Sequence, residues 1–431
     1  MVYVLDKDGN PLMPTKRYGK VRHLLKDNKA IVVRRDPFTI RLTYNSGKHK
    51  QPISLGVDAG SKHIGLSATT EKKELYSAQV EIRQDINKLL KARRDARRSR
   101  RSRKTRYRKP RFLNRVHSKK KGWLAPSVQA KCDTHVKVIK DVCKILPITA
   151  ITVEMAAFDT QKLKADILGL ERPKGTDYQH GETEGFNNIK AYVKWRDGYK
   201  CAVCGAEHVP LQVHHKKQRK DGGIDIPANL ITVCADCHKA YHAGILNSKK
   251  ASCMKPGTKI KAMRDAAFMG IMRWAVWDKL KELGIPLHMT YGYKTAETRR
   301  QYNLPKDHRV DARCISGHPN AEPTDECFFC KKVRCHNRQI HKAKILKGGI
   351  RKRNQAKHEV KGFRLFDTVI CRRTECFIFG RRSTGYMDVR MLDGTKVNAG
   401  ISYKKLKFVS SAKHLLIERR LLDGEHISSY G

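Results

Sequence analysis

The stretch LQVHHKKQRKDGGIDIPANLITVCADCHKAYH, Leu211–His242, follows closely after CAVCG, Cys201–Gly205, so two adjacent histidines stand between two Cys-x-x-Cys pairs. One interpretation assigns every Cys and His to a single metal site. In the other, the cysteines hold the fold and the histidines do chemistry. Four thiolates complete a tetrahedral zinc shell, whereas a disulfide is the competing use of such pairs. We predict one structural zinc ion, held by Cys201, Cys204, Cys234 and Cys237.

The histidines are then free for another role. His214 and His215 end a run typical of a strand, so their side chains are expected on opposite faces unless a bulge turns both inward. A turn leads on to Asn229, and His238 follows the last cysteine. This order resembles the HNH nuclease motif, which has a ββα-metal fold. A zinc-ribbon binding module with incidental histidines is the competing interpretation.

The resemblance to the HNH motif implies a role for each of these side chains. His215 would be the general base that activates water against a phosphodiester. His214 and His238 would hold a single Mg²⁺ that stabilises the transition state, with His242 as an alternative to His238. Asn229 would orient the loop and the base.

The charge of the chain narrows the class of partner. The 431 residues suffice for roughly two to four domains, and the formal net charge is +50. Such a chain needs an anionic partner; nucleic acid is the obvious one and a membrane surface the competitor. No apolar run approaches the roughly 20 residues of a spanning helix, and the start lacks an apolar signal region. We expect a cytoplasmic, nucleoid-associated prokaryotic protein, whose paired cysteines bind metal in a reducing compartment.

The most basic stretch is KLLKARRDARRSRRSRKTRYRKPRF, Lys88–Phe112. Residues 83–109 contain no Gly or Pro, which predicts a helix that Pro110 ends. Arginine all round excludes a core helix, and a solvated face or a disordered basic tail competes with a phosphate-binding helix. Arginine gives bidentate contacts to phosphate, so we favour nucleic-acid binding. The predicted contacts are Arg93, Arg94, Arg97, Arg98, Arg100, Arg101, Arg103, Arg106 and Arg108.

Three acidic segments surround the Cys/His unit. SLGVDAG carries Asp58, ITVEMA carries Glu154, and DHRVDARCI carries His308 and Asp311. Carboxylates at strand ends can jointly hold two Mg²⁺ ions, which need oxygen ligands. His308 and Asp311 are three residues apart and share a face in a helical turn, so His308 could position or deprotonate the attacking water.

The order of these parts is more specific than any one of them. An Asp-Gly hairpin, an arginine-rich helix, a Val-Glu-Met strand, the HNH insert and His-x-x-Asp together resemble a RuvC nuclease split into three parts, with an RNase H-like fold. The chain resembles the IscB family of transposon-associated, RNA-guided nucleases, and GNPLMPT (Gly9–Thr15) matches the PLMP segment of that family. The resemblance covers essentially the whole chain.

The resemblance implies an α/β multidomain fold with an RNase H-like (RuvC) core, an inserted ββα-metal HNH domain, an arginine-rich bridge helix and a small C-terminal β-barrel. The predicted boundaries are 1–50 PLMP domain, 51–82 RuvC part I, 83–115 bridge helix, 116–160 RuvC part II, 161–190 linker, 191–245 HNH domain with zinc ribbon, 246–325 RuvC part III, 326–361 basic linker and 362–431 barrel, which would help to read a target-adjacent motif.

A second cysteine cluster lies in DECFFCKKVRCHNRQIH. Cys327 and Cys330, with Cys335 and two later histidines, are candidates for a second zinc site, and free thiols are the alternative.

The resemblance implies an RNA-guided, Mg²⁺-dependent DNA endonuclease, a monomeric protein in a ribonucleoprotein with a structured guide RNA. The HNH site would hold one Mg²⁺ and cut the strand paired to the guide. The RuvC site, with Asp58, Glu154, His308 and Asp311, would hold two Mg²⁺ and cut the displaced strand, while base pairing would choose the sequence. The alternatives are a protein-guided HNH/RuvC endonuclease of a mobile element and a catalytically inactive RNA-binding zinc protein.

Overall fold

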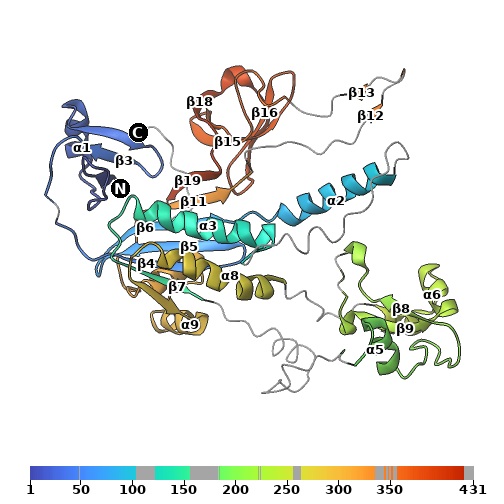
Figure 1. Ribbon diagram of the computed structural model, residues 1–431. Coiled ribbons are helices and arrows are strands. Elements are labelled where there is room, and N and C mark those ends of the chain that lie inside the picture. The colour runs from blue at the N-terminus through green and yellow to red at the C-terminus, as the bar shows by residue number, and fades with distance from the viewer. Residues whose placement is uncertain are drawn as a thin grey trace. The chain divides into compact units, whose positions relative to one another are not determined.

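The computed structural model divides the chain into two units, which are coloured along the sequence in Figure 1. Unit 1 comprises Met1–Ala157 and Phe268–Gly431, and unit 2 comprises Phe158–Ala267. In the part of the chain that the structure describes, no helix is long and apolar enough to cross a membrane. The described residues are 1–47, 49–102, 122–155, 183–255 apart from 184, 222 and 224, 264–334, 344–345, 348, 351–352 and 357–421.

Unit 1 is organised around a seven-stranded mixed sheet with the order β10-β7-β4-β5-β6-β11-β19. The antiparallel run β4-β5-β6 is extended by parallel pairing of β7 to β4, β10 to β7 and β11 to β6, and β19 closes the far edge antiparallel to β11. The strands are β4 (Ser54–Ala59), β5 (His63–Thr69), β6 (Glu74–Glu81), β7 (Ala150–Glu154), β10 (Leu287–Thr290), β11 (Glu326–Lys332) and β19 (Leu415–Leu421).

Helices cover both faces of this sheet. Helices α3 (Pro126–Cys143) and α8 (Arg264–Lys281) lie along the sheet (Figure 1). Their apolar side chains share one buried core with alternate residues of the central strands, such as Leu55 and Val57. The other face receives α10 (His308–Ile315) at two glycines. A Cβ at Gly56 would lie 1.9 Å from the Ala312 carbonyl oxygen, and one at Gly65 would lie 1.9 Å from the His308 carbonyl oxygen. These glycines let α10 lie directly on β4 and β5, which fixes the position of its first turn.

Two smaller sheets belong to the same unit. The first has the order β1-β3-β2 and packs with α1, and the second is antiparallel with the order β17-β16-β15-β14-β18. A two-stranded ribbon joins β12 to β13. The remaining described elements of unit 1 are β1 (Tyr3–Leu5), α1 (Tyr18–Lys26), β2 (Ala30–Arg34), β3 (Thr39–Leu42), α9 (Gly292–Gln301), β12 (Lys344–Ile345), β13 (Arg351–Lys352), β14 (Thr368–Cys371), β15 (Thr374–Arg381), β16 (Tyr386–Arg390), β17 (Lys396–Ser402), the 3₁₀ turn η6 (Tyr403–Lys405) and β18 (Lys407–Ser410).

Unit 2 is a β-hairpin flanked by short helices. Strands β8 (Leu211–His215) and β9 (Leu230–Cys234) pair antiparallel without a bulge, and α6 (Ala235–His242) follows β9 directly. The pattern ββα is the one predicted for an HNH domain. The remaining elements are α5 (Ile189–Arg196), α7 (Ser248–Ala251) and the 3₁₀ turns η3 (Arg219–Asp221), η4 (Pro227–Asn229) and η5 (Ser252–Met254).

The mixed α/β, multidomain class is confirmed, but three predicted boundaries are wrong. Residues 326–361 are not all linker, because β11 is a strand of the large sheet. The predicted barrel 362–431 loses β19, which pairs with β11 because its apolar residues complete the core there. The segment after residue 245 still belongs to unit 2, since Met254 is buried against Cys201 and Val233.

The basic helix is confirmed as α2 (Ile86–Ser102). Its arginines Arg93, Arg94, Arg97 and Arg98 are exposed, as a helix that binds phosphates requires. The side chains of Arg100 and Arg101, the residues Arg103, Arg106 and Arg108, and the predicted end at Pro110 lie outside the described part.

Candidate active sites

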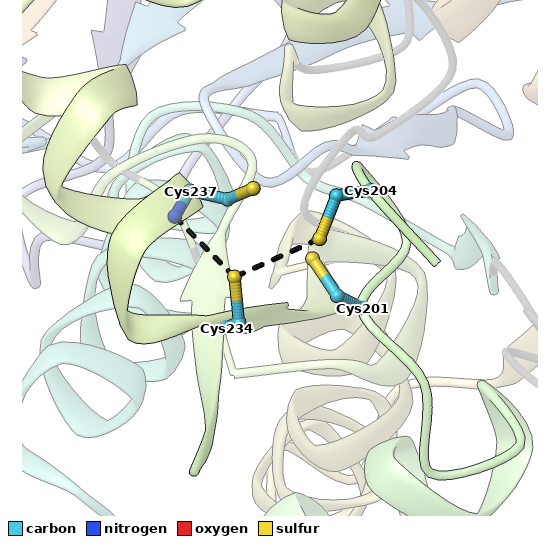
Figure 2. Close-up of side chains that lie close together, drawn as sticks. All are labelled: Cys201, Cys204, Cys234 and Cys237. Carbon is cyan, nitrogen blue, oxygen red and sulfur yellow. Dashed lines mark hydrogen bonds between the residues drawn. The ribbon is translucent and has the colours of Figure 1, made fainter. Parts of the chain in front are cut away.

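The four predicted cysteines meet in unit 2, from two turns of the chain (Figure 2). Cys201 and Cys204 lie in the turn after α5, Cys234 ends β9 and Cys237 lies in the first turn of α6. Their sulfur atoms all lie within 4.8 Å of one another, and none of the four forms a disulfide.

This group fits a zinc ion. Bonds of about 2.3 Å from zinc to sulfur place tetrahedral sulfur ligands about 3.8 Å apart, and the sulfurs of Cys204 and Cys234 are 3.8 Å apart. Burial works to raise the pKa of Cys201, but hydrogen bonds from backbone N–H groups, including those of Cys234 and Cys204, outweigh it and lower that pKa to about 6. A thiolate is the species that binds zinc. Burial and the neighbouring cysteines raise the pKa of Cys237, so only a bound cation would hold all four thiolates together.

Three histidines form a second group beside β8. His214, His238 and His242 place ring nitrogens within 4.8 Å of one another. Nε2 of His238 is 3.0 Å from Nδ1 of His214 and 3.2 Å from Nε2 of His242. Metal–nitrogen bonds of about 2.0–2.1 Å give separations of about 3 Å between neighbouring ligands. The structure therefore brings together His214, His238 and the alternative ligand His242.

Two imidazoles of this group, those of His214 and His238, are shifted toward the neutral form by lowered pKa values. Burial, followed by the nearby His238 and His242, lowers the pKa of His214 to about 4. Burial also lowers the pKa of His238, with His242 as the second cause. Neutral imidazole is the form that binds metal. Imidazole nitrogen suits zinc, nickel, copper or iron, whereas Mg²⁺ prefers oxygen, so the donor set does not favour the Mg²⁺ predicted for His214 and His238.

His215, the next residue of β8, is not part of this ligand group. Its Nε2 is 2.7 Å from Oδ1 of Asp225, which also pairs with Arg219. His214, His215 and Arg219 line one pocket of about 300 Å³ together with His238 and His242.

Asn229 is fully buried and fastens the loop that follows β8. Its Oδ1 accepts from the Lys217 N–H at 2.8 Å, and its Nδ2 donates to the Lys217 carbonyl at 3.0 Å. Its own carbonyl accepts from the Lys216 N–H at 2.8 Å. These bonds fix the backbone directly after His215.

The acidic residues of unit 1 gather at the carboxyl end of two parallel strands. Val57 of β4 pairs with Val153 of β7, so Asp58 and Glu154 are the next neighbours in register. Asp58 lies on the same strand face as Gly56, the face that α10 covers. Nδ1 of His308, the first residue of α10, is 2.6 Å from Oδ2 of Asp58. The fold therefore brings residues from far apart in the sequence to one place.

The pKa values of His308, Glu154 and Asp311 are shifted by their surroundings. The hydrogen bond to Asp58 raises the pKa of His308. Burial raises the pKa of Glu154, and the charges of Asp58 and Asp311 add to it. Burial also raises the pKa of Asp311, against the lowering effect of Arg299. Crowded, half-buried carboxylates suit a divalent cation with oxygen ligands. However, they do not converge as closely as the cysteines and histidines of unit 2.

Helix α9 supplies contacts that the sequence did not reveal. Thr295 donates to Oε2 of Glu154 at 2.7 Å, and Arg299 pairs with Asp311 at 2.5 Å. Gly292 lies against the same carboxylate, because a Cβ there would be 3.0 Å from Oε1 of Glu154. Residues 292, 295 and 299 are spaced to share one face of a helix, and this spacing in the sequence could have indicated that they act together. Asp225 and Gln212, which contact His215 and His238, left no comparable signal.

The second predicted zinc site is not supported. Cys327 and Cys330 are three apart on the extended strand β11, which turns their side chains to opposite faces. Both are buried, and Cys330 lies in the core of the large sheet. They cannot both hold one ion. The other proposed ligands, Cys335, His336 and His341, lie outside the described residues.

Two known families match the chain. The family described as RRXRR protein matches residues 2–181, and the family described as HNH endonuclease matches residues 201–244, which include both ligand groups of unit 2. The part of the chain that carries the cysteine and histidine groups is therefore similar to HNH endonucleases. Over 54 residues the chain is also 35% identical to Anaredoxin of Nostoc sp. (strain PCC 7120 / SAG 25.82 / UTEX 2576), a match that covers 12% of this chain and 71% of that protein, so the stretch belongs to one family with it.

Solved structures similar to the chain include Streptococcus thermophilus Cas9 in complex with AGGA PAM, at 15% identity and a TM-score of 0.34 over 53% of this chain and 31% of that one. The same protein in complex with AGAA PAM gives 14% identity and a TM-score of 0.33 over 62% and 32%. The chain spans about a third of the length of these Cas9 chains.

Proposed function

We propose that this protein is an RNA-guided DNA endonuclease that cuts the strand paired to its guide with the HNH site and the displaced strand with the carboxylate site. The observation that carries the proposal is the presence of two chemically different candidate sites, one in each unit of a chain of net charge +50. Two sites would let a single chain cut both strands. Such an enzyme would act in the cytoplasm of a prokaryotic cell, where it would associate with the nucleoid.

In the HNH site, His215 acts as the general base. When its Nε2–H donates to Asp225, Nδ1 keeps the lone pair and can accept a proton from water. Asp225 holds the ring in this tautomer, and Asn229 holds the backbone behind it. His214, His238 and His242 would hold a first-row transition ion, which would stabilise charge on the phosphate and the leaving oxygen. The four cysteines would hold a structural zinc ion.

In unit 1, Asp58, Glu154 and Asp311 would hold two Mg²⁺ ions, which would stabilise the attacking and leaving oxygens. His308 lies at the edge of this group, and its side chain is 42% exposed, so it can reach water. With Nδ1 bound to Asp58, its Nε2 is the nitrogen that positions or deprotonates that water. The large sheet with α10 would be the RuvC, RNase H-like domain of the resemblance.

The remaining parts would bind nucleic acid. The exposed arginines of α2 would contact the backbone of a guide–target duplex, so sequence choice would stay with base pairing. The five-stranded C-terminal sheet would be the barrel that helps to read a target-adjacent motif. A structured RNA and target double-stranded DNA are thus the proposed partners of a single protein chain.

The decisive experiment is to express the gene with its native flanking DNA, purify the protein at high salt and sequence the RNA that stays bound. A discrete structured RNA with one variable end is expected. Only heterogeneous RNA, or none, would contradict guidance and favour a protein-guided HNH/RuvC endonuclease. Intact RNA binding without any metal-dependent cleavage would instead favour an inactive RNA-binding zinc protein.

A further inference from the structure

A second, larger cavity adjoins the histidine group of unit 2. It has a volume of about 640 Å³ and lies between α5 and β8. Lys190 and Lys194 of α5 line one side, and Gln212 of β8 lines the other. His238 and Val213 line both this cavity and the smaller pocket that contains His215. The two hollows are therefore neighbours on either side of a shared histidine.

The lining of the cavity suits a polyanion. It includes the two lysines and Asn188 but no carboxylate. Lys190 and Lys194 are four apart on α5 and lie on one face, about 6 Å from each other. This spacing lets the two ammonium groups contact successive phosphates of one strand. Lysine on a flexible stem serves phosphate as a point charge.

Tyr199 adds an aromatic surface at the rim, held there at a conformational cost. Its side chain is 57% exposed and its φ is +56°, a left-handed backbone that L-residues with bulky side chains rarely adopt. The turn is pinned by hydrogen bonds from the Gly198 N–H to the Trp195 carbonyl and from the Tyr199 N–H to the Lys194 carbonyl. Folding gains nothing evident from this exposed ring, which points to a ligand.

The cavity is also connected to the metal ligands. Gln212 Oε1 is 2.7 Å from Nδ1 of His238, and this contact directs Nε2 of the same ring toward His214. A ligand that lies along β8 would therefore contact the residue that orients His238.

We propose that this cavity binds the strand that the HNH site cuts, on one side of the scissile phosphate. Lys190 and Lys194 contact two phosphates, and Tyr199 stacks on one unpaired or end-exposed base. The inference rests on the proposed function in one respect, namely that the HNH site is the one that cuts. It goes further by naming the surface that positions the strand. Stacking of a base on an aromatic ring contributes about 1–3 kcal/mol, so its loss should weaken binding by about 5- to 160-fold.

The test uses the purified ribonucleoprotein and a target labelled separately on each strand. Tyr199→Gly removes the ring but relieves the left-handed strain, so unit 2 should melt at the same temperature or higher. At subsaturating enzyme it should cut the guide-paired strand at least fivefold more slowly, and saturating enzyme should largely restore the rate. The displaced strand serves as the internal control. Equal rates on both strands for variant and wild type would overturn the proposal.

The contribution of the two lysine charges is tested by a double variant and a matched control variant. Lys190→Ala/Lys194→Ala should reduce the slope of log affinity against log salt concentration for the paired strand by about 1.4 to 1.8, as expected for two lost phosphate contacts. Lys200→Ala is the control, because Lys200 pairs with Glu207 at 2.6 Å and does not line the cavity. A control that changes the slope as much as the double variant would contradict the assignment.

Photo-crosslinking separates this inference from the proposed function. The full-length protein is mixed with a single-stranded oligonucleotide that carries 4-thiothymidine, and crosslinked peptides are mapped by mass spectrometry. Crosslinks in Asn188–Lys200, lost in Tyr199→Gly, would support the cavity even if guided cutting were absent. Crosslinks elsewhere only would refute the cavity even if guided cutting were present.

Discussion

The two candidate sites differ in how far the protein completes them without metal. In unit 2, imidazole nitrogens and cysteine sulfurs already lie at ligand spacing. In unit 1, the carboxylates are held apart, with Asp58 against His308 and Asp311 against Arg299. Ligands that can be uncharged lie close together at little electrostatic cost. Carboxylates repel one another, and here two of them pair with basic side chains of the protein instead.

This difference should appear as different metal dependence. The cysteine group is expected to hold its ion as part of the fold, the histidine group to select for nitrogen-binding ions, and the carboxylate group to need hard cations.

Removing the zinc should unfold unit 2 and spare unit 1. Structural zinc contributes about 10–16 kcal/mol in small domains, more than the small core around Cys201, Cys234 and Met254 can replace. Cys234→Ser should lower the bound zinc by one ion per chain and make residues within 183–255 sensitive to protease. Cys253→Ser is the control, since Cys253 lies in the same unit outside the ligand group. Equal zinc content in both variants would refute the site.

Replacing Mg²⁺ by Ni²⁺ should separate the two cutting activities. Ni²⁺ suits imidazole ligands, so cleavage of the paired strand should continue, while cleavage of the displaced strand should fall at least 100-fold. His242→Ala should abolish the Ni²⁺-supported cleavage and leave the Mg²⁺-supported cleavage of the displaced strand intact. Loss of both activities together in Ni²⁺ would show that the sites do not differ as described.

Crowding α10 should disturb the carboxylate site alone. Gly65→Ala places a Cβ 1.9 Å from the His308 carbonyl oxygen, so α10 must shift and unit 1 should lose about 3 kcal/mol of stability. Displaced-strand cleavage should fall with it. Gly270→Ala is the matched control, because no atom lies within 4 Å of its new Cβ and an interior glycine of α8 weakens that helix. That variant should be neutral or stabilising by denaturant titration.

Acidification should destabilise unit 1 through His135 of α3. Burial lowers its pKa from 6.5 to about 4, so the unfolded chain binds the proton first. The stability that neutral His135 contributes is complete above pH 6.5 and is lost as the pH falls toward 4. His135→Leu should therefore gain about 2 kcal/mol relative to wild type between pH 7 and pH 5, measured by urea titration of unit 1. His23→Leu, at an exposed position on α1, should show no such gain.

The sequence predicted most clearly what local spacing determines. Two Cys-x-x-Cys pairs, the ββα order and the basic helix follow from patterns a few residues long, and the structure has all three. Asp58, Glu154 and His308 were predictable only as parts of a family order. Their proximity depends on parallel pairing of β4 with β7 and on Gly56 and Gly65, which no local pattern announces.

The errors have the same origin. Cys327 and Cys330 have the spacing of a metal turn, but apolar neighbours place them in a buried strand, where the same spacing separates the side chains. β19 reads locally like another strand of the terminal sheet, and only long-range pairing with β11 assigns it to the core. Asp225 contacts His215 from a loop, and Gln212 of β8 contacts His238 of α6. A single sequence carries no local pattern that would predict these two contacts.

We propose that one chain carries two independent nuclease sites, each of which cuts a different strand of the target DNA. The most direct test is strand-resolved cleavage of a guide-matched target by His215→Ala and Asp58→Ala. We expect His215→Ala to cut only the displaced strand and Asp58→Ala to cut only the paired strand. In each variant the cleavage rate of the uncut strand should fall at least 100-fold, because a general base or a metal ligand has been removed. If either variant cut both strands at the wild-type rate, or if both lost the same strand, the assignment of two sites would be wrong.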